Sequence, residues 1–209
     1  MRHPDPRVFI QQNLRLQPAP SVPGINLYAA HPGSGLWRLL GRDGDVPPYW
    51  AYHWAGGTVL ARYILDYPEI VRGKSLIDLG SGSGVVGIAA MMAGAQAVTA
   101  IDIDPYATAA TLLNAQANGV NLTAFTGGLT SSPQADLILG GDVFYDEALA
   151  EKMSGLFGEC VAQGIAVLVG DMGRKPLPIE RLEPLAEYEV PDFGQGQLLK
   201  AKVFKYKGS

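Results

Sequence analysis

The feature that most constrains the fold is a glycine-rich stretch directly after an apolar run. Residues 76–88 read Leu-Ile-Asp-Leu-Gly-Ser-Gly-Ser-Gly-Val-Val-Gly-Ile, with glycines at positions 80, 82, 84 and 87. The apolar residues before the first glycine are typical of a buried strand, and those after the third are typical of a helix. Because glycine lacks a Cβ, the loop between them can turn sharply and lets backbone approach a ligand closely. The stretch therefore predicts a strand, a ligand-binding loop and a helix.

The chain beyond residue 72 alternates short apolar runs with longer amphipathic stretches, which is typical of parallel strands joined by crossover helices. Strands are expected at residues 75–79, 97–101, 122–125, 136–139 and 165–169. Helices are expected at residues 85–93, at residues 105–118 after an Asp104 cap, and along the apolar face of Leu149, Met153, Leu156, Phe157 and Cys160. The pattern predicts an α/β fold with a doubly wound, mostly parallel sheet.

The C-terminal tail contains two further β-like runs, at residues 187–190 and 198–206. A Gly-Gln-Gly-Gln segment joins them and suits a hairpin loop, so an antiparallel strand is expected at the end of the sheet. Within the last run Ala201 and Val203 alternate with lysines, but Phe204 breaks the phase. The sequence does not decide which face of this strand is buried.

The first 72 residues differ from the rest in being rich in proline and aromatic residues. A chain of 209 residues has room for one α/β domain and an appendage, but not for a second catalytic domain. We therefore expect residues 1–72 to form a mostly helical N-terminal appendage and residues 73–209 to form the ligand-binding catalytic domain.

Composition bounds the partners and the compartment. The net charge of -4 disfavours a nucleic-acid partner, because phosphate binding depends on clustered Lys and Arg. No apolar run approaches the roughly 18 residues of a membrane-spanning helix, so no membrane association is expected. The single cysteine, Cys160, rules out an internal disulfide and favours a cytoplasmic location. No spacing of His, Cys and carboxylates suggests a metal site, and the oligomeric state is not determined.

Two cofactors fit the glycine loop. The stretch from Gly82 to Gly87 satisfies the GxGxxG pattern, and Asp102 lies 20 residues beyond Gly82, as in NAD-dependent oxidoreductases. However, Asp78 precedes the first glycine by two positions, where its carboxylate would face an anionic pyrophosphate. The cationic amino group of S-adenosylmethionine suits that carboxylate better. S-adenosylmethionine is the predicted cofactor, and NAD remains the alternative.

The predicted cofactor contacts gather at the ends of the expected strands. Asp102 ends the second strand and can accept hydrogen bonds from both ribose hydroxyls. The segment after the third strand reads Phe-Thr-Gly-Gly and offers no side chain suited to the adenine amino group, so the adenine contact stays open. The full set of predicted cofactor residues from these strands and loops is Asp78, Gly80, Ser81, Gly82, Asp102, Ile103 and Gly141.

With the glycine loop in place, the chain resembles the seven-strand protein-lysine methyltransferases that act on folded non-histone proteins. Asp142-Val143-Phe144-Tyr145, after the fourth strand, is similar to the acid-x-x-aromatic motif of that family. Residues 47–63, which read Pro-Pro-Tyr-Trp-Ala-Tyr-His-Trp-Ala-Gly-Gly-Thr-Val-Leu-Ala-Arg-Tyr, resemble the branch that methylates the electron transfer flavoprotein β subunit. So does Gly-Asp-Met-Gly-Arg at residues 170–174, with Met172 where proline is usual. The resemblance spans roughly residues 45 to 175.

This resemblance implies a Rossmann-like class I methyltransferase fold and S-adenosylmethionine-dependent methylation of a protein lysine. It implies the flavoprotein β subunit as the substrate and places Trp54 against the cofactor. Asp142 and Tyr145 are the expected catalytic residues, with Asp142 capturing and orienting the lysine. A small-molecule methyltransferase and a non-catalytic binding module are the other readings, and the carboxylate of Asp142 argues against the binding module.

Overall fold

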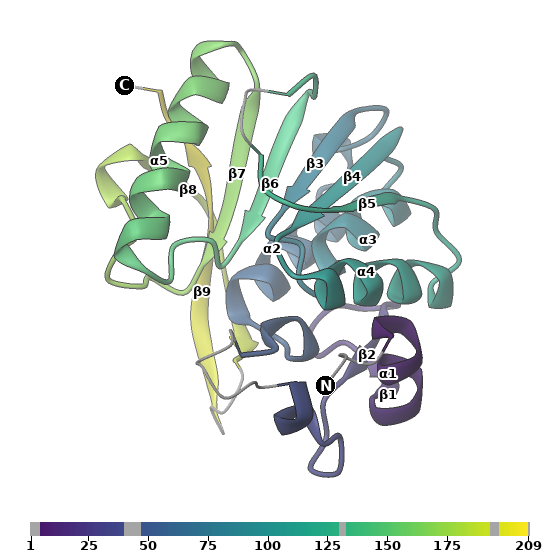
Figure 1. Cartoon of the computed structure of the whole chain (residues 1–209). Helices are drawn as coiled ribbons and strands as arrows, with labels where there is room; N and C mark the ends of the chain where they lie inside the picture. The colour runs from purple at the N-terminus through teal and green to yellow at the C-terminus, as the bar shows by residue number, and fades with distance from the viewer. Residues whose placement is uncertain (1–4, 40–46, 130–132, 193–196, 209) are drawn as a thin grey trace.

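The centre of the molecule is a seven-stranded sheet with the spatial order β5-β4-β3-β6-β7-β9-β8 (Figure 1). This computed structural model describes residues 5–39, 47–129, 133–192 and 197–208. The strands from β5 to β7 pair in parallel, whereas β9 is antiparallel to both β7 and β8. The predicted α/β fold, with a mostly parallel sheet and an antiparallel C-terminal end, is confirmed.

The strands and their covering helices lie close to the predicted ranges. The strands are β3 (Ser75–Leu79), β4 (Ala97–Asp102), β5 (Thr123–Thr126), β6 (Leu137–Gly141), β7 (Ala166–Asp171), β8 (Leu182–Pro191) and β9 (Leu198–Tyr206). The helices are α2 (Ala55–Asp66), α3 (Val85–Met92), α4 (Pro105–Ala117) and α5 (Glu147–Ala162). The clear difference is β8, which begins at Leu182 rather than at residue 187. Residues 194–196 of the expected hairpin loop lie outside the described residues.

Two aspartates start the helices that follow β4 and β6. The side chain of Asp104 accepts a hydrogen bond from the backbone N–H of Tyr106 at 2.7 Å, and Pro105 occupies the first turn of α4. The side chain of Asp146 accepts from the backbone N–H of Leu149 at 3.1 Å, at the start of α5. These caps satisfy N–H groups that have no partner within the helix. They leave Asp102 as the last residue of β4 and Asp142 in the short turn between β6 and α5.

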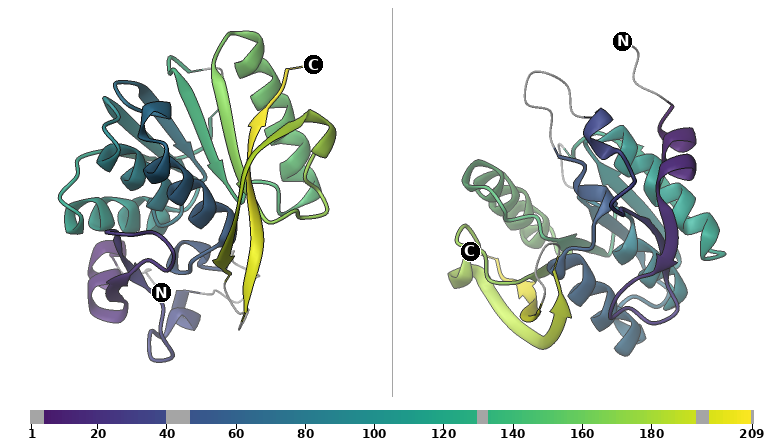
Figure 2. Two further views of the ribbon diagram at one scale, coloured as in Figure 1. Left: turned by 180° about the vertical axis from the view of Figure 1, so that it is seen from behind. Right: turned by 90° about the horizontal axis from the view of Figure 1, so that it is seen from below.

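The two faces of the sheet carry separate apolar cores. Leu137 and Leu139 of β6 pack in one core with side chains of α2 and α3, whereas Ile138 packs in the other core with side chains of α5. The alternation follows from the period of two in a strand. Figure 2 shows α5 and the helices α3 and α4 on opposite sides of the sheet. The sheet is therefore covered on both faces, as predicted for a doubly wound fold.

Each face of β9 is buried over a different part of the strand, which answers the question left by its sequence. Ala201 and Val203 face the core that contains α2, whereas Phe204 and Tyr206 face the core that contains α5. Lys202 lies on the same side of the strand as Phe204 but stays exposed. The change of phase at Phe204 thus marks the place where the second core begins to cover the strand.

The N-terminal region contains strands as well as helices. It holds α1 (Pro6–Asn13), the antiparallel pair β1 (Arg15–Pro18) and β2 (Asn26–Ala29), the 3-10 turns η1 (Leu36–Leu39), η2 (Tyr49–Ala51) and η3 (Pro68–Ile70), and α2. The side chain of Asn114 on α4 accepts a hydrogen bond from the backbone N–H of Tyr28 at 2.7 Å and donates one to the carbonyl of Ser83 at 2.8 Å. Asn114 thus joins this region to the glycine loop. The domain boundary at residue 72 stays a prediction.

No helix in the described ranges is long and apolar enough to cross a membrane.

Candidate active site

A cavity of about 510 Å³ lies at the carboxyl ends of the parallel strands. Its walls come from the turns after β3, β4, β5 and β6, together with η2, the start of α2 and one side of α5. In open parallel sheets, ligands bind in the crevice beyond the carboxyl ends, where the strand order reverses. Here the order reverses between β3 and β6.

The glycine loop needs glycine at several positions. Gly80, Gly82 and Gly84 have φ angles of +68°, +52° and +80°, a backbone region that favours glycine. A Cβ on Gly84 would also lie 2.8 Å from the Thr111 side chain on α4. The loop therefore lies close against α4, and its backbone forms part of the cavity wall.

Asp78 is a buried carboxylate beneath this loop. Its side chain is 1% exposed, and one of its oxygens accepts a hydrogen bond from the backbone N–H of Gly87 at 2.9 Å. Burial raises its pKa to about 7, against the opposing effect of that hydrogen bond. Asp78 lines the cavity, so a cation bound there would stabilise its ionised form.

Asp102 joins the ends of two strands through its side chain. Its Oδ2 accepts from the backbone N–H of Gly82 at 2.9 Å, and its Oδ1 accepts from that of Asp104 at 2.9 Å. Burial raises the pKa of Asp102, although both hydrogen bonds act to lower it. The neighbouring Ile103 lines the cavity with a side chain that is 70% exposed.

The wall beyond Ile103 is made of backbone and apolar groups. Gly127, Gly128 and Leu129 line the cavity after β5, and the backbone N–H of Gly127 donates to the carbonyl of Asp102 at 2.8 Å. Phe125, which precedes them in β5, is not among the cavity-lining residues. Among the described residues that follow β5, only backbone and apolar groups line this part of the cavity, so the adenine contact stays open.

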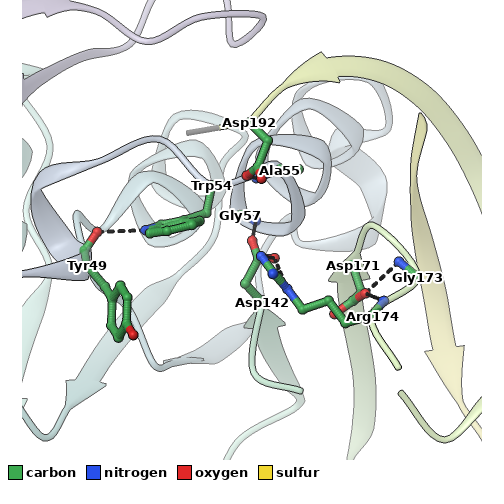
Figure 3. Close-up of polar contacts among 9 residues, drawn as sticks. All are labelled: Tyr49, Trp54, Ala55, Gly57, Asp142, Asp171, Gly173, Arg174 and Asp192. Carbon is green, nitrogen blue, oxygen red and sulfur yellow. Dashed lines mark hydrogen bonds and ion pairs between the residues drawn. The ribbon is translucent and has the colours of Figure 1, made fainter. Parts of the chain in front are cut away.

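Asp142 is held in one orientation by two partners (Figure 3). Its Oδ1 accepts from Arg174 Nη2 at 2.9 Å and from Arg174 Nε at 3.2 Å, and its Oδ2 accepts from the backbone N–H of Gly57 at 2.9 Å. The residue has a φ of +56°, a backbone conformation that costs free energy for residues other than glycine. Burial raises the pKa of Asp142 to about 6, although Arg174 acts to lower it.

Arg174 and two further carboxylates are residues whose place in the site the sequence did not reveal. Asp171 is fully buried at the end of β7, and its Oδ1 accepts from the backbone N–H groups of Gly173 at 2.6 Å and Arg174 at 2.8 Å. Asp192 follows β8 and accepts from the backbone N–H of Ala55 at 3.0 Å. The Gly-Asp-Met-Gly-Arg segment contains Asp171 and Arg174 and could have pointed to them, whereas no sequence pattern pointed to Asp192.

Three aromatic side chains, Tyr49, Trp54 and Tyr145, line the same cavity as Asp142. The indole N–H of Trp54 donates to the carbonyl of Tyr49 at 2.8 Å, and the two rings lie 5.5 Å apart. The ring of Tyr145 lies 5.8 Å from that of Tyr49 and is half exposed. The guanidinium of Arg174 lies 5.9 Å from the centre of the Trp54 ring. The cavity thus offers an aromatic wall next to a carboxylate.

All the predicted cofactor-binding and catalytic residues line this one cavity. They are Trp54, Asp78, Gly80, Ser81, Gly82, Asp102, Ile103, Gly141, Asp142 and Tyr145. Lys152 of α5 lines it as well and was not expected there. Within the described part of the chain, no group of three or more His, Cys, Asp or Glu side chains could hold a metal ion.

Comparison with known proteins identifies the family. The family model of ribosomal protein L11 methyltransferase (PrmA) matches residues 58–168. The electron transfer flavoprotein beta subunit lysine methyltransferase of Rattus norvegicus is 45% identical over 199 residues, which cover 89% of this chain and 77% of the relative.

Solved structures agree with the fold. The ribosomal protein L11 methylase of Lactobacillus delbrueckii subsp. bulgaricus has a TM-score of 0.52 at 22% identity, covering 72% of this chain and 78% of its own. An RNA methyltransferase of Salinibacter ruber in complex with S-adenosyl-L-homocysteine has a TM-score of 0.51 at 19% identity, covering 71% and 89%. At these identities the likeness shows the class I methyltransferase fold alone. The long match to the rat enzyme goes further: this chain belongs to the electron transfer flavoprotein β-subunit lysine methyltransferases, a family of S-adenosylmethionine-dependent enzymes.

Proposed function

We propose that the enzyme transfers methyl groups from S-adenosylmethionine to lysine side chains of the electron transfer flavoprotein β subunit. The observation that carries the proposal is the position of Asp142 and Tyr145, which line the same cavity as the glycine loop and lie beside an aromatic wall. The substrate protein is taken from the names of the relatives, with which this chain shares most of its length.

The cofactor residues have separate roles in this proposal. The backbone of Gly80, Ser81 and Gly82 passes along the cofactor, and the carboxylate of Asp78 faces its amino group. Asp102 accepts hydrogen bonds from the ribose hydroxyls, because each of its oxygens has a second lone pair beyond the one used by a backbone N–H. Ile103 would contact the adenine of the bound cofactor, and Gly141 and Trp54, which line the same cavity, would complete the cofactor site.

The chemical step requires mainly placement and a neutral amine. The cofactor supplies a methyl group already activated by its positive sulfur. As the lysine nitrogen forms its bond to this carbon, the carbon–sulfur bond breaks and the electron pair stays on sulfur. A lysine with a reference pKa of about 10.4 must first lose a proton, which at pH 7 costs about 4.6 kcal/mol. The proton passes to solvent.

Asp142 and the aromatic wall orient the amine. The carboxylate of Asp142 is fixed between Arg174 and Gly57, so it presents a constant position to an incoming nitrogen. The rings of Tyr145 and Trp54 line the path of the lysine side chain and attract its cationic end by cation–π interaction. Productive placement of this kind contributes much of the rate in a displacement reaction.

A cytoplasmic location is part of the proposal. The single cysteine, Cys160, is buried in the apolar core under α5, as suits a reducing compartment. Fractionation of the source cells, followed by immunodetection of the enzyme, tests this location.

The direct test combines labelled cofactor with the recombinant flavoprotein β subunit. We expect methylated lysines in the substrate, and we expect Asp142→Asn to lower the single-turnover rate by roughly 100-fold, or about 2.7 kcal/mol. Calorimetry should show far less change in cofactor affinity, since the variant keeps the cofactor contacts. Tyr145→Ala should impair the rate more than Tyr145→Phe, because the ring matters more than the hydroxyl.

Asp146→Asn is the matched control, because the side chain is exposed at the start of α5 and asparagine is an equally good helix cap. It should keep the full rate. A normal rate in Asp142→Asn would remove Asp142 from the mechanism. Labelling of small molecules without labelling of protein would overturn the substrate assignment.

A further inference from the structure

Asp142 already carries an ion pair before any substrate is present. Its Oδ1 accepts hydrogen bonds from Nε and Nη2 of Arg174, and its Oδ2 accepts one from the backbone N–H of Gly57. The side chains of Asp142 and Arg174 are only 11% and 23% exposed, so water screens the pair weakly. An incoming lysine therefore meets a carboxylate that is shared with a guanidinium.

Arg174 is itself held from both ends. Its backbone N–H donates to the buried Asp171, and its guanidinium lies near the Trp54 ring as well as on Asp142. Burial alone would lower the pKa of Arg174, but the carboxylates of Asp142, Asp171 and Asp192 raise it. The arginine is thus a fixed positive charge in the wall of the site.

A carboxylate alone would work against the chemical step. It stabilises the ammonium form of a neighbouring lysine and so raises the pKa of that lysine, whereas the reaction requires the neutral amine. A guanidinium paired with the same carboxylate cancels part of this effect. The carboxylate can then accept a hydrogen bond from the amine without strongly favouring its protonated form.

We propose that Arg174 is a positioning residue for methyl transfer, which fixes the carboxylate of Asp142 and cancels part of its charge, so that the carboxylate orients the substrate lysine in its neutral form. This inference rests on the proposed lysine methylation. It deepens that function by assigning a role to a residue outside the acid-x-x-aromatic motif.

The other groups around Asp142 are mostly acidic or neutral. Asp171 lies at the end of β7, and Asp192 follows β8. The cavity is also lined by Tyr145, which follows β6, and by Tyr49, His53 and Trp54, which precede α2. Burial lowers the pKa of His53. Asp78 and Asp102 lie toward the glycine loop, and Lys152 of α5 is the other lysine or arginine among the described residues that line the cavity. Loss of Arg174 would therefore leave more negative than positive charge around Asp142.

The first measurement is the pH dependence of single-turnover methylation of the flavoprotein β subunit by wild type, Arg174→Gln and Arg174→Lys, at saturating substrate. Arg174→Gln removes the charge, so the rising part of the plot of rate against pH should shift by about one pH unit toward alkaline pH. This shift lowers the rate at pH 7 by about 10-fold. The rate should approach that of wild type at high pH. Arg174→Lys keeps the charge and should keep the position of this rising part, at a lower rate because the two-pronged contact is lost.

Arg62→Gln is the matched control, since Arg62 forms an ion pair with Asp66 on the outer side of α2. It should leave the profile unchanged. A rate in Arg174→Gln that falls equally at every pH indicates a structural role and overturns the proposal. An unchanged rate overturns it too.

A second measurement needs no turnover. Carbon-13 NMR titration of the Asp142 carboxyl group should show a higher pKa in Arg174→Gln than in wild type, because Arg174 holds that pKa down. If wild type fails to methylate the β subunit, the proposed function fails, and this titration still decides whether Arg174 sets the charge of Asp142. Equal pKa values in the two proteins would reject the inference.

Discussion

At the scale of single residues, Asp102 shows how one side chain organises the cofactor loop. Its two oxygens hold the backbone N–H groups of Gly82 and Asp104, one in the glycine loop and one in the turn after β4. Asp102 also lines the cavity where we place the ribose. The residue thus fixes the loop and offers acceptors to the ligand.

Asp102→Ala should weaken S-adenosylmethionine binding by about 1 to 3 kcal/mol, because the ribose hydroxyls lose charged acceptors. Isothermal calorimetry measures the change. Asp136→Ala is the control. The Asp136 carboxylate also accepts a hydrogen bond from a backbone N–H, that of Ser75 at 2.8 Å, but it lies at the amino ends of the strands, away from the cavity. Equal affinities for the Asp102 variant and wild type would reject the ribose assignment.

We expect Asp78 to make cofactor binding depend on pH. Its raised pKa of about 7 leaves the carboxyl group half protonated near neutrality. A cationic amino group beside it favours the ionised form, so binding lowers this pKa and releases a proton. Affinity should therefore rise between pH 6 and pH 8 and should fall as the pH drops below 7.

Calorimetry at pH 7 in two buffers of different ionisation enthalpy measures the proton released on binding. Asp78→Asn should abolish this release, because asparagine does not titrate. The absence of proton release in wild type would show that the amino group is bound elsewhere.

At the scale of elements, the start of α2 is wedged against the ends of β6 and β7. A Cβ on Gly170 would lie 2.1 Å from the carbonyl oxygen of Gly56, and one on Gly141 would lie 2.7 Å from the Cα of Gly57. This close approach brings the backbone N–H of Gly57 to Asp142. The position of the carboxylate is thus set by the packing of a helix on two strands.

Gly170→Ala should lower the free energy of unfolding by about 1 to 3 kcal/mol or more, because the helix must move away from the sheet. Chemical denaturation measures it. The control is Gly155→Ala in α5, where a Cβ meets nothing within 4 Å and alanine favours the helix by up to about 1 kcal/mol. Equal stabilities of the two variants would contradict the close packing.

At the scale of the whole molecule, the cavity draws on every layer. Its walls include η2 and α2 from the N-terminal region, four strand ends of the sheet, and α5 from the opposite face. A ligand in this cavity therefore contacts both apolar cores. Binding should stabilise the fold as one unit.

S-adenosyl-L-homocysteine at 100 times its dissociation constant should raise the free energy of unfolding by about 2.7 kcal/mol. Circular dichroism and tryptophan fluorescence, which includes Trp54 beside the cavity, should report the same raised melting temperature. Asp102→Ala should show a smaller increase at the same ligand concentration. Two separate transitions would show that the N-terminal region and the sheet unfold independently.

The sequence by itself determined the order and type of the elements from the glycine loop onward. Strand bounds such as Ser75–Leu79 and Leu198–Tyr206 follow from local apolar runs, and the starts of α4 and α5 follow from Asp104 and Asp146. The candidate site was also within reach of the sequence, because parallel strands bring their carboxyl ends to one edge. That rule gathered residues as distant as Asp78 and Tyr145 in one cavity.

The tertiary structure alone decided which partners these residues have. The ion pair of Arg174 with Asp142, the contact of Asp192 with Ala55 and the packing of β9 against two different cores join residues far apart in the chain. Local sequence patterns carry no information about such pairs, because the pairs form only where helices and strands pack within a few ångströms of one another. The predicted cofactor and catalytic residues could therefore be assigned to one edge of the sheet from the sequence, whereas Arg174, Lys152 and the electrostatics of the site required the fold.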